Sequence, residues 1–152
     1  MGIEIERKYL VKGSQWKTDR PANLVQGYLC TTEGSTVRVR IADLKAFLTI
    51  KGKTTGISRA EFEYEIPLSD AKELLQLSNG SLVKKQRHSV QHQGFLWTID
   101  EFSGENEGLI VAEIELDSNQ QTFAKPEWIT SEVSTDPRYR NSYLTKHPFS
   151  QW

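Results

Sequence analysis

The sequence has little of what marks secreted, membrane-spanning or nucleic-acid-binding proteins. Its 152 residues include one cysteine, Cys30, so no disulfide can form within the chain, which favours a reducing compartment. The sequence shows no apolar signal segment and no apolar run long enough to span a bilayer. The formal net charge is −1, so no excess of either sign points to a nucleic acid or membrane partner. We expect a cytoplasmic protein with one domain over residues 1–152.

What the sequence does contain is a repeated pattern of charged residues. Side chains alternate between the two faces of a β-strand, so residues 3–11 place Glu4, Glu6 and Lys8 on one face and mostly apolar residues on the other. The same pattern recurs in six later segments, 36–41, 47–51, 59–66, 83–87, 95–100 and 109–116. Any one of them fits an ordinary half-exposed strand. The recurrence of a charged row in all of these segments predicts instead that the charged faces line a polar cavity.

The charged rows fall into two chemical groups. The carboxylates are Glu4, Glu6, Glu61, Glu63, Asp100, Glu113 and Glu115, and the cations are Lys8, Arg38, Arg40, Lys51, Arg59, Lys85 and Arg87. Hard divalent cations bind several carboxylate oxygens, whereas phosphate oxygens bind arginine forks and lysine point charges. The two groups together suit a polyanion bridged by divalent metal ions.

The start of the chain resembles a known family. Glu4-x-Glu6-x-Lys8 is similar to the N-terminal signature of the triphosphate tunnel metalloenzymes, also called the CYTH superfamily. The later pairs follow in the order of that family: Arg38-x-Arg40, Lys51, Glu61-x-Glu63, Lys85-x-Arg87, Asp100, Glu113-x-Glu115 and the C-terminal stretch 136–141. The resemblance covers nearly the whole chain. It implies an α+β, mainly β fold, a closed eight-stranded antiparallel β-barrel whose polar interior holds a triphosphate and one or two metal ions.

Three short helices are expected outside this barrel. The first covers residues 69–78, with Asp70 as its N-cap and Asn79-Gly80 as its stop. The second covers residues 118–124, ahead of Pro126, and the third includes residues 138–144. Helices this short gain most of their stability from packing, so we expect them against the apolar outer face of the sheet.

The resemblance assigns roles to the charged residues. Glu4, Glu6, Glu63, Glu113 and Glu115 are candidate ligands of Mg²⁺ or Mn²⁺, and Glu61 and Asp100 are candidates to ligate the metal or orient its waters. Because Mg²⁺ takes few protein carboxylates, some of the seven must balance neighbouring cations instead. The seven cations are candidate phosphate clamps, although Arg59 could simply pair with Glu61, which shares its face.

Lys85 and Tyr28 are the candidate catalytic residues. A lysine inside a cationic cluster has a depressed pKa, which would let Lys85 accept a proton. Tyr28 occupies a position similar to that of a tyrosine thought to assist this lysine in bacterial triphosphatases of the family, although it could equally be a core tyrosine. The outward parity of Arg7, Lys84 and His88 predicts that they lie outside the cavity.

Three functions fit these residues. The first is hydrolysis of the terminal phosphoanhydride of inorganic triphosphate by metal-activated water. The second is a class IV type adenylate cyclase, and the third is a non-catalytic triphosphate-binding module. The sequence shows no assignable nucleobase pocket, which favours the triphosphatase. It leaves open a nucleoside or thiamine triphosphate as substrate, and a homodimer as the assembly.

Overall fold

The computed structural model describes residues 2–152, so Met1, the first residue of the predicted domain, lies outside the described part. Almost all regular structure is strand. The strands are β1 (Ile3–Val11), β2 (Ala22–Thr31), β3 (Ser35–Ala42), β4 (Lys45–Gly52), β5 (Ser58–Ile66), β6 (Asn79–His92), β7 (Phe95–Phe102), β8 (Ile110–Glu115) and β9 (Ile129–Glu132). The helices are α1 (Leu68–Leu75) and α2 (Asn141–Leu144), with 3-10 turns at Gly104–Asn106, Pro137–Tyr139 and Phe149–Gln151.

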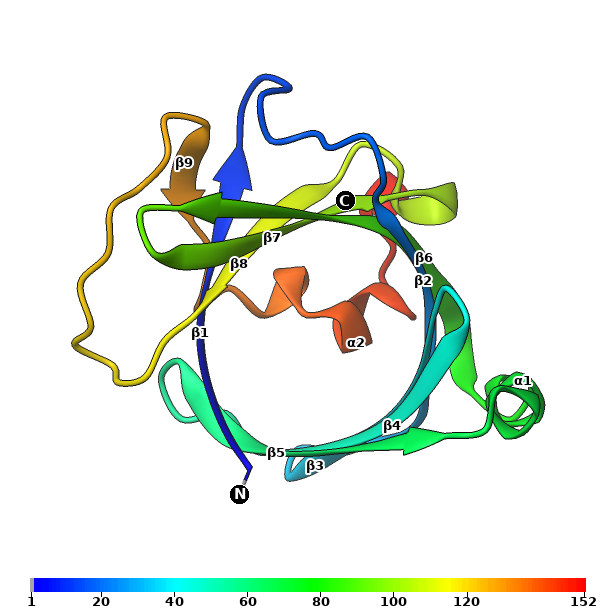
Figure 1. Ribbon diagram of the computed structural model, residues 1–152. Helices are drawn as coiled ribbons and strands as arrows, with labels where there is room; N and C mark the ends of the chain where they lie inside the picture. The colour runs from blue at the N-terminus through cyan, green and yellow to red at the C-terminus, as the bar shows by residue number, and fades with distance from the viewer. Residues whose placement is uncertain (1) are drawn as a thin grey trace.

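The first eight strands form a closed antiparallel barrel, as the sequence predicted (Figure 1). Around the barrel the strands follow the order β5-β4-β3-β2-β6-β7-β8-β1, and β1 then pairs with β5 to close the ring. β1 does this by changing partner along its length, since Ile3 to Ile5 pair with β5 and Glu6 to Leu10 pair with β8. β9 adds a short strand to the end of β1 and takes no part in closure.

The register of the strands brings the charged rows together on the inner face. Arg38 lies opposite Thr49, Lys51 opposite Glu61, and Arg87 opposite Asp100. The alternate side chains point outward, where Tyr9 and Trp97 belong to a buried aromatic and aliphatic cluster under the long connections. The barrel therefore has an apolar outer layer on this side and a polar interior, the arrangement expected from the alternation in the sequence.

Helix α1 packs on the outside of the barrel, as expected. Its Ala71 is fully buried against Val39 and Ala46 of β3 and β4. The helix predicted at residues 118–124 is wrong, because this segment is a turn followed by irregular chain. Phe123 there packs edge-on against Tyr9 and Trp97, so one partly buried aromatic side chain, rather than a helix face, anchors the segment.

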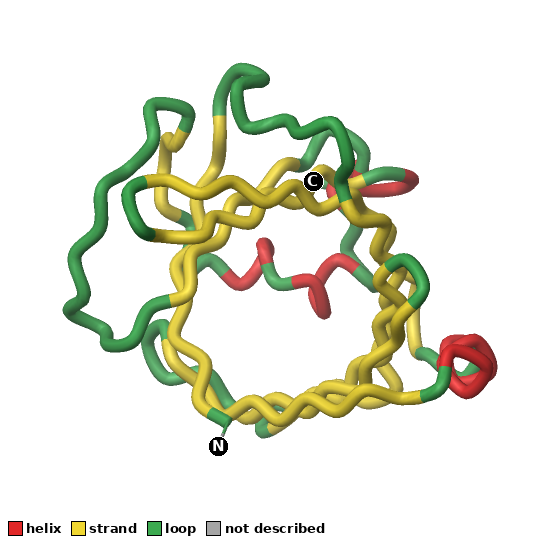
Figure 2. Tube along the Cα trace, viewed as in Figure 1, coloured by secondary structure: helices red, strands yellow, loops and turns green. Residues whose placement is uncertain are grey.

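The C-terminal segment, residues 137–151, lies differently from the expectation. Its helical turns are present, but α2 lies across the barrel opening rather than on the outer face (Figures 1 and 2). Leu144 of α2 is 1% exposed and packs inside the barrel in a cluster with Val83, Phe102, Leu109 and Val111. The segment thus closes one end of the barrel with an apolar floor, and it leaves a cup rather than an open tunnel.

Gly80 was expected to end the first helix, but it instead allows the C-terminal segment to pack closely against the barrel. It lies at the start of β6 with φ +76°, a conformation that favours glycine. A Cβ at this position would approach the Thr145 carbonyl oxygen to 2.8 Å. The missing side chain therefore lets the C-terminal segment dock closely, and the Ser81 N–H donates to that same Thr145 carbonyl at 2.9 Å.

Candidate functional site

A charged chamber occupies the interior of the barrel above the apolar floor. It is lined by every predicted site residue except Asp100, namely Glu4, Glu6, Lys8, Tyr28, Arg38, Arg40, Lys51, Arg59, Glu61, Glu63, Lys85, Arg87, Glu113 and Glu115. Four further residues complete the lining: Thr36 of β3 and Arg140, Asn141 and Ser142 of the C-terminal segment. The structure thus brings together residues from seven strands, β1 to β6 and β8, and from the segment that closes the floor.

The chamber has an acidic side and a cationic side. Glu4 and Glu6 on β1, with Glu113 and Glu115 on the adjacent β8, form the acidic side. In the cyclic strand order, β1 stands four places from β2 and β8 stands four places from β3, so these strands face each other across the lumen. β3 carries Arg38 and Arg40, two of the predicted phosphate clamps. An anion that binds these arginines therefore faces the carboxylates.

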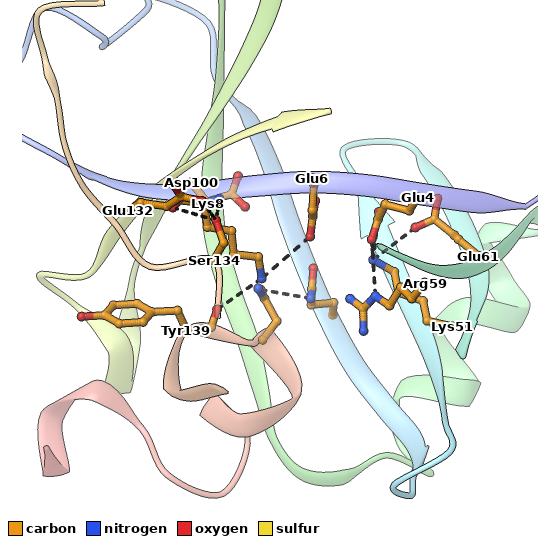
Figure 3. Close-up of polar contacts among 12 residues, drawn as sticks. Glu4, Glu6, Lys8, Lys51, Arg59, Glu61, Asp100, Glu132, Ser134 and Tyr139 are labelled. Carbon is orange, nitrogen blue, oxygen red and sulfur yellow. Dashed lines mark hydrogen bonds and ion pairs between the residues drawn. The ribbon is translucent and has the colours of Figure 1, made fainter. Parts of the chain in front are cut away.

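At one end of the chamber Lys51 neutralises two carboxylates (Figure 3). Its Nζ atom lies 3.1 Å from Oε1 of Glu4 and 3.1 Å from Oε2 of Glu61, while Arg59 Nε lies 3.4 Å from Glu4 Oε1. Burial by itself raises the pKa of Glu4, but Lys51 and Arg59 outweigh it and lower the pKa to about 2. Arg59 is therefore an ion-pair partner of Glu4 in this structure, where the sequence had offered a phosphate clamp or a pair with Glu61.

Neutral and acidic side chains hold Arg38 and Arg40 through hydrogen bonds and one ion pair. An Arg38 terminal nitrogen donates to Thr49 Oγ1 at 3.1 Å and lies 3.4 Å from Oε2 of Glu63. Arg40 Nε donates to Oε1 of Gln26 at 3.0 Å. Burial, reinforced by the nearby positive charge of Arg38, lowers the pKa of Arg40 to about 10. Such crowding of cations favours an anionic ligand.

Asp100 lies behind the chamber wall, between two cations of β6. Its Oδ2 is 2.7 Å from Lys85 Nζ, and Arg87 donates to both carboxylate oxygens at 2.7 and 2.8 Å. Its side chain is 1% exposed. Burial acts to raise the pKa of Asp100, but Lys85 and Arg87 hold it well below its usual range. Both oxygens are therefore already engaged by cations.

Lys85 has the most unusual environment among the cations. Its side chain is 1% exposed and stands 5.4 Å from the Phe102 ring centroid. Burial lowers its pKa to about 7, helped by the positive charges of Arg87 and Arg40 and opposed by Asp100. The sequence had pointed to a lowered pKa from the cationic cluster, whereas burial is the larger cause here.

Glu6, Glu113 and Glu115 form a crowded group of carboxylates. Glu6 pairs across the strands with Glu115, and like charges placed directly opposite each other are destabilising. Burial, the charge of Glu113 and the charge of Glu4 raise the pKa of Glu6 to about 8, despite the opposing charge of Lys8. Burial and the charges of Glu4 and Glu113 also raise the pKa of Glu115. In residues 2–152 no three His, Cys, Asp or Glu side chains stand in a ready-made metal cage. The carboxylate crowding on β1 and β8 nevertheless matches the donor set that a hard divalent cation prefers.

Two functional features were missed in the sequence. The first is strand β2 with its Gln26, which shares the inner face with the predicted Tyr28. Gln26 is fully buried and donates from Nε2 to the Tyr28 hydroxyl at 3.3 Å. The second is Asn141, whose Oδ1 accepts from Lys85 Nζ at 2.9 Å. Asn141 lies in the stretch 136–141 that resembled the family, but no local signal shows that this stretch enters the barrel.

The residues expected outside the cavity lie there. Arg7 pairs with Glu132 of β9 at 2.8 Å, and Lys84 is exposed. His88 is 3% exposed, but it packs against Trp16 outside the barrel, and its Nδ1 accepts from the Thr18 N–H at 2.9 Å. None of the three lines the chamber.

Within the described chain, no helix has the length and apolar character needed to cross a membrane.

Comparison with known proteins shows which family has this sequence and fold. The CYTH domain family matches residues 2–146. An inorganic triphosphatase of Acetivibrio thermocellus is 47% identical over 154 residues, covering 100% of this chain and 99% of that protein. An inorganic triphosphatase of Nitrosomonas europaea is 35% identical over 145 residues, covering 93% of this chain and 95% of that protein. A crystal structure of an inorganic triphosphatase matches with a TM-score of 0.68 at 33% identity, covering 93% of each chain.

The family match extends over the strands that build the barrel and over the residues that line its chamber. The two curated relatives align over almost the whole chain. The chain belongs to the CYTH domain family.

Proposed function

We propose that the protein is a metal-dependent triphosphatase that hydrolyses the terminal phosphoanhydride of inorganic triphosphate inside the barrel. The observation that carries the proposal is the chamber itself, where buried cations on one side face crowded carboxylates on the other. The two curated relatives, at 47% and 35% identity, are both named inorganic triphosphatases, which supports the same activity for this chain.

The cations of the chamber would bind the phosphate oxygens. Arg38 and Arg40 on β3, and Lys85 and Arg87 on β6, approach from strands that flank β2, while Lys8, Lys51 and Arg59 approach from the other walls. Arg40 uses only Nε to hold Gln26, so its two terminal nitrogens remain available to form a fork with a phosphate. Several fixed cations around one polyanion favour binding without any contact to an organic group.

The carboxylates would hold a divalent cation, Mg²⁺ or Mn²⁺. Glu6 and Glu115 are best suited because burial and neighbouring carboxylates raise their pKa values. Glu113 stands beside them on β8 and would complete the set, although Lys8 and Arg87 outweigh its burial and lower its pKa. Glu4, Glu61 and Glu63 already pair with Lys51 or Arg38, so we assign them to charge balance around the ligands. A bound divalent ion would neutralise phosphate oxygens and lower the pKa of a coordinated water.

Asp100 would act on the cations rather than on the metal. Its two oxygens hold Lys85 and Arg87, and its side chain is shielded from the chamber by them. We propose that it orients these two cations toward the phosphates. The sequence analysis had instead made Asp100 a candidate to ligate the metal or to orient its waters.

Lys85 would accept a proton from the attacking water. Its lowered pKa of about 7 leaves a fraction of neutral amine at physiological pH. Tyr28, 6% exposed and hydrogen-bonded to Gln26, lines the same chamber and would orient the water or the phosphate. Phosphoryl transfer through a loose transition state needs little base assistance, so positioning and charge supply most of the acceleration.

The cyclase and the binding module are the competing functions. A cyclase must hold adenine and ribose, yet Tyr28 is the one aromatic residue among the described residues that line the chamber, and none of them is aliphatic. The binding module requires a chamber without an activated water. The cytoplasmic location, the single domain over residues 1–152, the absence of nucleic acid and membrane partners and the assembly state stay predictions from the sequence.

A steady-state comparison of substrates tests the proposal. Phosphate release from inorganic triphosphate and from ATP should be measured under Mg²⁺ and under Mn²⁺, with cyclic AMP measured in the ATP reactions. We expect inorganic triphosphate to be hydrolysed much faster than ATP. Preferential use of ATP with cyclic AMP as product would favour the cyclase instead.

A further inference from the structure

The C-terminal segment touches the two lysines at opposite sides of the chamber. Lys8 Nζ donates to the backbone carbonyl of Tyr139 at 3.5 Å, as Figure 3 shows, and Lys85 Nζ donates to Oδ1 of Asn141 at 2.9 Å. Arg140, between these two residues in the sequence, lines the same chamber. The segment is therefore part of the chamber wall as well as its closure.

The Asn141 side chain joins a relay of hydrogen bonds that crosses β2. Arg40 Nε donates to Gln26 Oε1 at 3.0 Å, and Gln26 Nε2 donates to Asn141 Oδ1 at 3.2 Å. Oδ1 thus accepts from both Gln26 and Lys85. The same Gln26 nitrogen also donates to the Tyr28 hydroxyl at 3.3 Å. The Gln26 carboxamide therefore contacts the predicted clamp Arg40 and the candidate catalytic Tyr28 directly. It reaches the candidate base Lys85 through Asn141.

The direction of this relay follows from the chemistry of its ends. Arginine and protonated lysine only donate hydrogen bonds, so Gln26 must turn its oxygen to Arg40 and its nitrogen to Asn141. Asn141 must then turn its oxygen to both Gln26 and Lys85. Neither amide can flip without placing a donor against a donor, and Gln26 is fully buried. The relay therefore fixes the orientations of both amides.

The position of Asn141 is itself fixed by the segment that carries it. Three residues later Leu144 is buried in the apolar floor, and Thr145 accepts from the Ser81 N–H at 2.9 Å. Upstream, the Val133 N–H donates to the Lys8 carbonyl at 2.8 Å. Asn141 thus stands between two anchored points, so its carboxamide is held at a defined height in the chamber.

We propose that Asn141 is a positioning residue for Lys85 and, through Gln26, for Arg40 and Tyr28; this role rests on the proposed hydrolysis. The site is complete only when the C-terminal segment is docked. Asn141 suits this role because its oxygen accepts two hydrogen bonds without adding negative charge beside a polyanion. A carboxylate would accept the same bonds but would repel the substrate.

The test compares Asn141→Ala and Asn141→Asp with the unmutated protein. The kcat and KM for inorganic triphosphate should be measured under Mg²⁺, together with a thermal melt of each variant. Lys146→Ala, an exposed change in the same segment, serves as the control. Misplacing a reacting group by about 1 Å costs on the order of 10²-fold in rate, so we expect Asn141→Ala to lower kcat by about that factor with KM changed less than about threefold. Asn141→Asp should recover most of kcat, with a raised KM, and Lys146→Ala should match the unmutated protein.

Each outcome decides a separate point. If Asn141→Ala keeps kcat within about twofold of the unmutated value, or if kcat falls and KM rises in equal proportion, the positioning role is overturned while the hydrolysis stands. If Asn141→Ala does not fold, Asn141→Asp decides: kcat within about tenfold of the unmutated value supports the role, and a loss near 10²-fold overturns it. An unmutated protein without any turnover of triphosphate would overturn the proposed hydrolysis and this role with it.

Discussion

Replacing Asp100 by asparagine should destabilise the protein even when no metal is bound. The change removes the one negative charge that holds Lys85 and Arg87 at 2.7 to 2.8 Å, at a site whose side chain is 1% exposed. Removing one partner of a buried ion pair costs roughly 3–5 kcal/mol, because a buried charge is left uncompensated. For a protein of this size each kcal/mol shifts Tm by about 2–4 °C, so we expect Tm to fall by roughly 6–20 °C.

The assay is a thermal melt followed by circular dichroism, with the protein kept in excess chelator. The exposed Asp19→Asn is the matched control, since it removes one carboxylate without touching the barrel interior. If Asp100 instead acted mainly as a metal ligand, the chelated variant would melt close to the unmutated protein and a difference would emerge only with metal. A change in Tm below about 2 °C in chelator would refute the ion-pair role.

Four further predictions follow from the chamber. Arg40→Ala should reduce turnover by on the order of 10²-fold in a phosphate-release assay, and Arg40→Lys should restore only part of it because the guanidinium fork is lost. The exterior variant Arg7→Ala should stay near the unmutated rate. Equal sensitivity of Arg7 in the same assay would contradict the assignment of strand faces. The kcat should rise with pH through about 7 as Lys85 loses its proton, and Lys85→Ala should lack this limb in a pH–rate profile; an unchanged profile would leave Lys85 as a phosphate contact only. Excess chelator should abolish hydrolysis, and substantial residual phosphate release would contradict the metal requirement. Because the pKa of Glu6 is raised to about 8, the native state holds a proton there that the unfolded chain has lost above about pH 4.5. The metal-free protein should therefore lose up to about 1.4 kcal/mol of unfolding free energy per pH unit between pH 5 and 7. Denaturant melts should show a smaller slope in Glu6→Gln, and an equal slope in both proteins would rule out Glu6 as its source.

The alternation of side chains made much of the barrel predictable from the sequence. A strand has a period of two, so a charged row backed by an apolar row identifies both the strand and its inner face. The rows that contain Glu4, Arg38, Lys51 and Glu113 all line the chamber as expected. This works because the inner rows of the barrel are charged and the outer rows are mostly apolar, which gives the two faces opposite character.

Strand β2 escaped the same analysis for a physical reason. Its inner row consists of Leu24, Gln26 and Tyr28, which carry no charge, so the contrast between its two faces is weak. All three side chains are buried, and Gln26 forms hydrogen bonds with Arg40, Tyr28 and Asn141. The strand was therefore not recognisable from its own residues.

Long-range docking accounts for the other differences. Local sequence indicated helical turns near residues 138–144, but only the cavity at the end of the barrel determines that Leu144 enters it. The depth of Asp100 depends likewise on its partner strand, since Lys85 and Arg87 of β6 cover it. Parity placed Asp100 on the correct face, but parity carries no information about which inner side chains reach the ligand.

Product analysis by ³¹P NMR tests the central claim most directly. Inorganic triphosphate, the purified protein and Mg²⁺ should be incubated together, with Asn141→Ala and Lys146→Ala samples beside the unmutated protein. We expect the triphosphate signals to be replaced by orthophosphate and diphosphate in equal amounts, at a much lower rate in Asn141→Ala and at the unmutated rate in Lys146→Ala. Triphosphate that binds but remains intact would contradict the account and identify the chamber as a binding module.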